Sequence, residues 1–297
     1  MRVTANTGYQ NMLADIQRAA DDLAKWQRQV SSGKRVNAPH DDPAAAMVAI
    51  SERGELALTE SYGDAAAAVE SRLTAIDTVL SDLVNQLEDA KVTAAAGRST
   101  ILSANQRETL AQQLEGLKAA IAADLNSQFR GTYVFSGTAA TTQPYPVQAS
   151  GTVDPYQGNT SVARVEVNRG EMVQVTFDGD AVARGTDTDN VFEMMDALIS
   201  AVRTGDMTGI DAGIAGLDRA FDRVTSTQSA VGISLSTLEG QKARIAELRI
   251  KSIERISKAE DANLAEAITN MTRAETAQRA ALAAAASRSS QSLMDYL

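Results

Sequence analysis

Few side chains in this chain are of the types that carry catalytic or metal chemistry. Its 297 residues include no Cys and one His, which excludes thiolate nucleophiles, disulfides and Cys-ligated zinc. The run His40-Asp41-Asp42 combines imidazole and carboxylate, which several divalent ions accept as ligands. Asp42 precedes Pro43, however, and is placed to cap the start of a helix. We therefore expect no metal site, no cofactor and no catalytic residue.

Two other patterns have a chemical and a structural interpretation. Gly209, Gly213 and Gly216 have the spacing of a sparse phosphate loop, but no strand pattern precedes them and no Gly-Lys-Ser/Thr follows. We interpret them as a loosened helical connection. The basic residues between Lys242 and Lys258 alternate with glutamates, which is typical of a solvated helix face. The net charge of −10 further disfavours binding to nucleic acid or to an anionic membrane.

The composition indicates a soluble, folded chain of long helices. Hydrophobic residues make up 44% of the sequence and aromatic residues only 4%, so the apolar content consists of small side chains that allow close helix packing. The longest apolar stretches, 44–50 and 280–286, are far shorter than the roughly 18 residues of a membrane span. The N-terminal residues do not resemble a cleaved secretory signal, so any export would need another route.

The N-terminal region predicts one helix followed by a turn. Apolar positions between Met12 and Val30 advance by steps of three and four, which places them on one helical stripe. The glycine of Ser31-Ser32-Gly33 is the residue type preferred just beyond a helix end. A second helix is expected to begin at Asp42.

The middle of the chain predicts a helical hairpin followed by a small β segment. The series Val69–Leu87 keeps helical spacing, a turn is expected at 97–103, and a further helix spans Leu110–Leu125. At Gly131 the composition changes to Gly, Thr, Ser and Pro. Alternation at 164–167 and 173–177, with turn residues between them, then predicts a β-hairpin.

Helical spacing returns near Val191 and continues to the C-terminus, apart from an interruption at 205–213. The final stripe is narrow and flanked by alanine, like the stripe at the N-terminus. A helix with one apolar face is marginal alone, so the two ends are natural partners. The expected fold is mainly α with a small β insert. It is a long antiparallel helical bundle or coiled coil formed by the N- and C-terminal halves, and therefore a discontinuous domain.

Three motifs resemble the bacterial flagellin family, and within it the branch that lies at the hook-filament junction. The first is the run Ser31–Pro43 (SSGKRVNAPHDDP), which follows the N-terminal helix. The others are Gly131–Gly137 (GTYVFSG) and the closing Ser292–Leu297 (SLMDYL). Ala38 and His40 depart from the family pattern, where small hydroxylated residues are expected. The resemblance covers both helical halves and is thin in the β segment.

The resemblance implies a structural subunit of the flagellum with no enzymatic activity. Such a subunit is exported unfolded through the flagellar type III apparatus, without a cleaved signal peptide, and acts outside the cell. Its implied partners are copies of itself in a ring, the other hook-associated junction protein, flagellin, whose polymerisation it templates, and an export chaperone. No nucleic acid or membrane partner is implied. The alternatives are flagellin itself, the bulk filament subunit, and a cytosolic helical scaffold or binding protein.

These inferences define three expected parts of the chain. Residues 1–40 and 260–297 are terminal coiled-coil assembly segments, 41–137 and 190–259 form a helical bundle domain, and 138–189 form a small β domain. The stripes of the terminal segments are the expected assembly interface. Its candidate residues are Leu13, Ile16, Leu23, Val30, Leu264, Ile268, Met271, Leu282 and Leu293.

Overall fold

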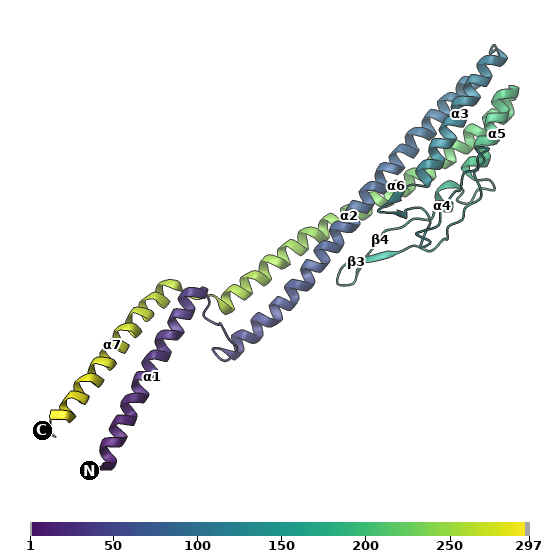
Figure 1. The fold of residues 1–297 in the computed structure, drawn as a ribbon. Coiled ribbons are helices and arrows are strands. Elements are labelled where there is room, and N and C mark those ends of the chain that lie inside the picture. The colour runs from purple at the N-terminus through teal and green to yellow at the C-terminus, as the bar shows by residue number, and fades with distance from the viewer. Residues whose placement is uncertain (1, 295–297) are drawn as a thin grey trace. The chain divides into compact units, whose positions relative to one another are not determined.

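The computed structural model describes residues 2–294 and the side chains of residues 7–287. Long helices dominate it, with two small antiparallel sheets, which confirms the predicted fold class (Figure 1). The elements in chain order are α1 (Arg2–Ser32), α2 (Pro43–Gly97), α3 (Ala104–Leu125), β1 (Gln128–Phe129), β2 (Thr132–Tyr133), β3 (Arg164–Asn168), β4 (Glu171–Gln174), α4 (Gly179–Ala183), α5 (Val191–Thr204), α6 (Met207–Glu260) and α7 (Leu264–Met294).

The chain divides into two compact units, and both are discontinuous in sequence. The first, here called the terminal unit, comprises 1–59 and 247–297. The second, the central unit, comprises 60–246. Two segments from opposite ends of the chain must therefore come together to form the terminal unit. The division into three parts by residue number, as expected from the sequence, stays a prediction.

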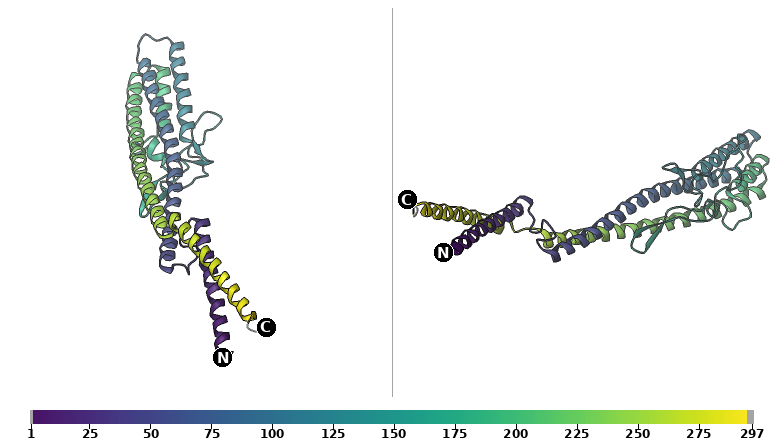
Figure 2. Two further views of the ribbon diagram at one scale, coloured as in Figure 1. Left: turned by 90° about the vertical axis from the view of Figure 1, so that its left-hand side faces the viewer. Right: turned by 60° about the horizontal axis from the view of Figure 1, so that its bottom comes forward.

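In the terminal unit, α1 and α7 pack side by side and run in opposite directions, so their free ends lie together (Figures 1 and 2). The unit also contains the beginning of α2 and the end of α6. The predicted helix stop is confirmed, because α1 ends at Ser32 and Gly33 adopts a φ of +70°. That left-handed conformation has little steric cost only for glycine.

The core of the central unit follows the predicted helical hairpin. The α2 residues Val69, Leu73 and Leu87 are at most 3% exposed, as the spacing predicts. From α3, Leu114 and Ile121 are also buried. The predicted turn at 97–103 is confirmed. Ser103 caps α3, because its side chain accepts a hydrogen bond from the backbone N–H of Gln106. The Gln106 side chain in turn accepts one from the backbone N–H of Ser103.

The β segment packs on these helices and shares their core. In the predicted hairpin, Val165 of β3 lies opposite Val173 of β4. Phe135 and Tyr145 are both fully buried and belong to the same hydrophobic cluster as the α2 and α3 residues. The Tyr145 ring lies 5.1 Å from the ring of Phe192 in α5. These contacts attach the β segment to the helices through packed side chains.

A polar contact from α2 adds to this attachment. The Arg72 guanidinium donates through Nε to the Val175 carbonyl oxygen at 2.6 Å and through Nη1 to Thr132 Oγ1 at 3.0 Å. It thereby links two parts of the β segment that are distant in sequence. Burial lowers the pKa of Arg72 from its usual value.

The interpretation of the three glycines as a loosened connection is wrong. Gly209, Gly213 and Gly216 all lie inside α6. In this region the helical path is interrupted only between Thr204, where α5 ends, and Met207, where α6 begins. A Cβ at Gly213 would lie 2.7 Å from Leu198 Cδ1, and one at Gly209 would lie 2.7 Å from the Ala201 Cβ. The glycines are therefore where α5 and α6 approach closely.

The C-terminal region differs from its prediction in a second way. The expected continuous helix is broken at 261–263, which separates α6 from α7. No proline or glycine lies at this position, and the helical spacing of apolar residues continues through it. The sequence therefore contains no local signal for the break. Contacts with the loop after α1 account for the break.

Candidate assembly site

The loop between α1 and α2 holds the break between α6 and α7 by backbone hydrogen bonds. Arg35 N donates to the Glu260 carbonyl oxygen at 2.6 Å, and Ala262 N donates to the Gly33 carbonyl oxygen at 2.9 Å. Lys34 and Asp261 form an antiparallel bridge between these segments. Because the loop satisfies backbone groups at the end of α6, the chain can leave the helix there without orphaned donors or acceptors.

A buried carboxylate reinforces this junction. The Glu260 side chain is 6% exposed, and its Oε2 accepts from Lys34 Nζ at 3.0 Å and from Arg53 Nη2 at 2.5 Å. The two cations come from different segments, the loop and α2. A buried carboxylate with two cationic donors is stable only while both segments are in place.

The two aspartates of the first motif organise the same loop. Asp41 Oδ2 accepts from Ala38 N at 2.9 Å and from Asn37 N at 3.0 Å, and these backbone hydrogen bonds lower the pKa of Asp41. Asp42 Oδ1 accepts from Ala45 N at 3.1 Å, which confirms it as the cap of α2. Both carboxylates thus serve the loop. Within residues 2–294, no group of three His, Asp or Glu side chains is placed to hold a metal ion.

Among the described side chains of α7, the buried ones are alanines. Ala267 and Ala274 of α7 are 1% and 9% exposed, and Gln29 near the end of α1 is 5% exposed. Gln29 Nε2 donates to the Arg35 carbonyl oxygen at 3.1 Å, which connects the pair to the loop.

The predicted assembly residues fall into two groups. Ile16, Leu23, Val30 and Met271 are half-buried. Leu13, Leu264, Ile268 and Leu282 are 42%, 48%, 48% and 51% exposed. The side chain of Leu293 lies outside the described residues. The terminal unit therefore presents large apolar side chains to its surroundings.

Sequence reasoning missed a second exposed apolar group on this unit. Met47 and Ile50 of α2 are 71% and 61% exposed, and Ile250 and Ile253 of α6 are 58% and 47% exposed. The apolar run 44–50 was the available signal. This run is too short for a membrane span, and none of the described helices has an apolar window long enough for one.

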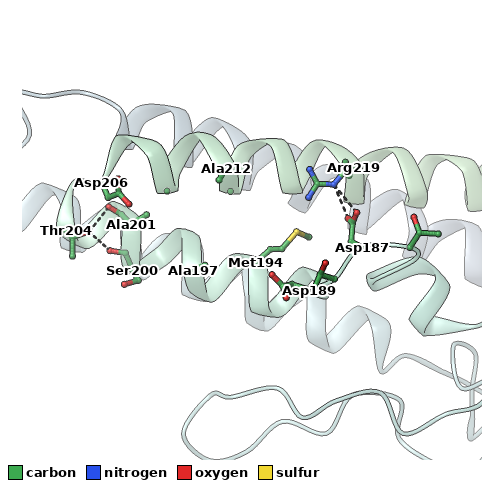
Figure 3. Close-up of a pocket in the computed structure, with 14 residues that line it drawn as sticks. Asp187, Asp189, Met194, Ala197, Ser200, Ala201, Thr204, Asp206, Ala212 and Arg219 are labelled. Carbon is green, nitrogen blue, oxygen red and sulfur yellow. Dashed lines mark hydrogen bonds and ion pairs between the residues drawn. The ribbon is translucent and has the colours of Figure 1, made fainter.

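A hollow of the central unit lies beside Gly209 and Gly213. It has a volume of about 680 Å³ and is lined by α5, the start of α6 and the loop before α5 (Figure 3). Two of the charged residues that line it form an ion pair, with Arg219 Nε 3.1 Å from Asp187 Oδ1. Arg223 Nη1 donates to the other Asp187 oxygen at 2.7 Å. These ion pairs occupy the carboxylate, so the hollow is explained as helix packing.

Packed terminal helices with exposed apolar side chains are typical of a subunit that contacts other chains. The chain belongs to the bacterial flagellin family. Residues 3–140 match the model of the bacterial flagellin N-terminal helical region, and residues 214–297 match that of the C-terminal helical region. This membership confirms the expectation of a structural protein and not an enzyme.

Two curated relatives extend the similarity over most of the chain. The chain is 23% identical to the flagellar hook-associated protein 3 of Escherichia coli (strain K12), over 93% of each protein. It is 24% identical to the flagellar hook-associated protein 3 of Salmonella typhimurium, over 80% of this chain and 81% of that protein.

Solved structures share the fold. A putative flagellar hook-associated protein from Vibrio parahaemolyticus matches with a TM-score of 0.69 at 20% identity, over 74% of this chain and all of the other. The flagellar junction protein FlgL from Legionella pneumophila matches with a TM-score of 0.62 at 16% identity, over 72% of this chain and all of the other.

Proposed function

We propose that this protein is the structural subunit that joins the hook of the bacterial flagellum to the filament. The observation that carries the proposal is the similarity to flagellar hook-associated protein 3 over 93% of both chains. The relatives that carry this name favour the junction role over flagellin, the bulk filament subunit.

The terminal unit supports a role in assembly on physical grounds. Burial of apolar surface stabilises contacts by about 25 cal/mol per Å². Leu264, Ile268 and Leu282 are each about half exposed, so contact with a neighbouring subunit can still bury much of their surface. Ala267 and Ala274 of α7 are buried, whereas these three larger side chains keep about half of their surface exposed. We infer that the predicted assembly residues contact neighbouring subunits.

The proposed partners follow from this role. The subunit forms a ring with copies of itself, contacts the other hook-associated junction protein on one side, and templates flagellin polymerisation on the other. Before assembly it is exported unfolded through the flagellar type III apparatus, accompanied by a chaperone, and without a cleaved signal peptide. The similarity to flagellin-family proteins supports this route.

Fractionation of cells tests the proposal. Flagella are sheared from the cells, and the protein is quantified in the sheared and cytoplasmic fractions, with flagellin measured in the same samples. A junction subunit enters the sheared fraction in far fewer copies than flagellin. Retention in the cytoplasm would contradict the proposal, and copy numbers equal to those of a bulk filament subunit would identify it as flagellin.

A further inference from the structure

Among the described residues, two buried side-chain oxygens have no hydrogen-bond partner, and both lie next to Asp124. They are Gln86 Oε1 of α2 and Ser127 Oγ, just after α3. Gln86 Nε2 donates to Asp124 Oδ2 at 2.6 Å, and the backbone N–H of Ser127 donates to the Asp124 carbonyl oxygen at 3.0 Å. Buried polar atoms in folded proteins are nearly always hydrogen-bonded, so the two exceptions indicate a function for this carboxyl group.

Asp124 lies where the helical hairpin meets the β segment. It is half-buried in the last turn of α3, which ends at Leu125. The carbonyl oxygen of Ser127 accepts from Val134 N at 3.3 Å, so the end of α3 is tied to the first turn of the β segment. A change in the hydrogen bonds of Asp124 therefore acts at the junction between α3 and the β segment.

The surroundings of Asp124 disfavour a negative charge on its side chain. Burial raises the pKa of its carboxyl above the usual 3.8, the hydrogen bond from Gln86 lowers it, and repulsion by Asp82 raises it. Asp82, on α2, is the charged group that acts on this carboxyl. The dipole of α3 adds to these effects, because the C-terminal end of a helix disfavours negative charge.

The Gln86 amide and the Asp124 carboxyl are complementary only when the carboxyl is protonated. An ionised carboxylate can only accept hydrogen bonds, so it satisfies Gln86 Nε2 and leaves Oε1 without a donor. A protonated carboxyl can donate its O–H to Oε1 while its other oxygen still accepts from Nε2. Proton uptake therefore adds one hydrogen bond and supplies a partner to the buried amide oxygen.

We propose that Asp124 and Gln86 form a proton-binding site that tightens the junction between α3 and the β segment as the pH falls. The proton is held on a carboxyl oxygen of Asp124 and is donated to Gln86 Oε1. Because the folded state binds this proton more tightly than the unfolded chain does, the stabilisation is present in acid and is lost as the pH rises. Asp42 of the terminal unit acts in the opposite direction, because the hydrogen bond from Arg35 lowers its pKa.

Asp124→Asn tests the site, because an asparagine amide reproduces the protonated carboxyl at every pH: it donates to Gln86 Oε1 and accepts from Nε2. Hydrogen exchange of the backbone N–H groups at the end of α3 is measured by NMR on the full chain at neutral pH. Exchange should be about two- to tenfold slower in the variant, the range expected for one added hydrogen bond. Asp89→Asn removes an exposed carboxylate of α2 and is the matched control, which should leave these rates unchanged. Exchange that is equally fast in Asp124→Asn and the unmodified chain overturns the inference.

The difference between Asp124→Asn and the unmodified chain should disappear in acid. Both proteins are compared at each pH from neutral to acidic, so the intrinsic pH dependence of exchange cancels in the ratio of their rates. The ratio should approach one as Asp124 takes up its proton, with a midpoint above 3.8. A ratio that stays constant with pH overturns the inference.

Gln86→Met tests the part of the amide oxygen. Methionine is a similarly long, unbranched side chain without the amide, and circular dichroism checks that the variant is folded. In this background Asp124→Asn still removes a half-buried charge but gains no amide partner, so the slowing of exchange should be smaller than in the unmodified chain. Slowing of the same size in both backgrounds would show that Asp124 responds to burial alone and that Gln86 is not part of the site.

Discussion

Lys34 and Glu260 lie 226 positions apart in the sequence, and their side chains form an ion pair with Nζ 3.0 Å from Oε2. The pair joins the loop after α1 to the end of α6. Arg53 completes it from α2, and the backbone of the loop accepts and donates hydrogen bonds at the same place. These contacts thus hold the loop after α1 and the end of α6 together next to the α1–α7 pair.

Replacement of Glu260 by Gln should destabilise the terminal unit by about 1–3 kcal/mol. The change removes the charge that two cations face, and the estimate lies below that for a fully buried pair because Lys34 and Arg53 are 43% and 49% exposed. Trp26, the one Trp of the chain, lies in the terminal unit. Its fluorescence during urea denaturation reports the unfolding of this unit.

Glu247→Gln is the matched control for this change. Glu247 pairs with Lys251 at 2.5 Å, but both side chains are more than half exposed. Such pairs contribute about 0.3–0.5 kcal/mol. Equal destabilisation by the two variants would contradict the role assigned to Glu260.

Acid should destabilise the terminal unit through Asp42. The hydrogen bond from Arg35 and that from the backbone of Ala45 hold the pKa of Asp42 below its usual 3.8. The stabilisation that the ionised Asp42 carboxylate gives to the folded state is therefore complete above pH 3.8 and is lost as the pH falls below this value. The urea midpoint from Trp26 fluorescence should decrease with acid, and less so in Asp42→Asn, which keeps a capping oxygen but does not titrate. Parallel acid profiles of the two proteins would rule out Asp42 as a source of the dependence.

Two substitutions in α7 should separate assembly from folding. Leu282 is 51% exposed, so Leu282→Asp should leave the isolated protein folded and abolish motility by placing a charge in the subunit contact. Ala267 is 1% exposed, so Ala267→Asp should break the α1–α7 pair itself and cost several kcal/mol. Circular dichroism and a swimming assay compare them. Normal swimming of the Leu282→Asp strain would refute the contact.

The sequence predicted the elements that local patterns encode. Helical spacing located α2 and α3, Gly33 located the end of α1, and Asp42 located the start of α2. These features depend on neighbours within a few residues, which is why they can be read without a structure.

Features that depend on distant residues could not be read in this way. The break after Glu260 is stabilised by a loop more than 220 positions away, and helical spacing alone passes through it. The prediction for the glycines of α6 is wrong because these positions require glycine for the close packing of α5, which the sequence pattern does not reveal. Within the candidate site, helical spacing predicts the apolar stripes, but their exposed fractions and the exposure of Met47, Ile50, Ile250 and Ile253 depend on packing in three dimensions.

Electron microscopy of cells that lack the protein tests the junction role most directly. In the proposed junction role, the subunit provides the template for flagellin at the end of the hook. Cells without the protein should carry hooks without filaments, and the unmodified gene should restore the filaments whereas the Leu282→Asp variant should not. Filaments of normal number and length on cells without the protein would contradict the account.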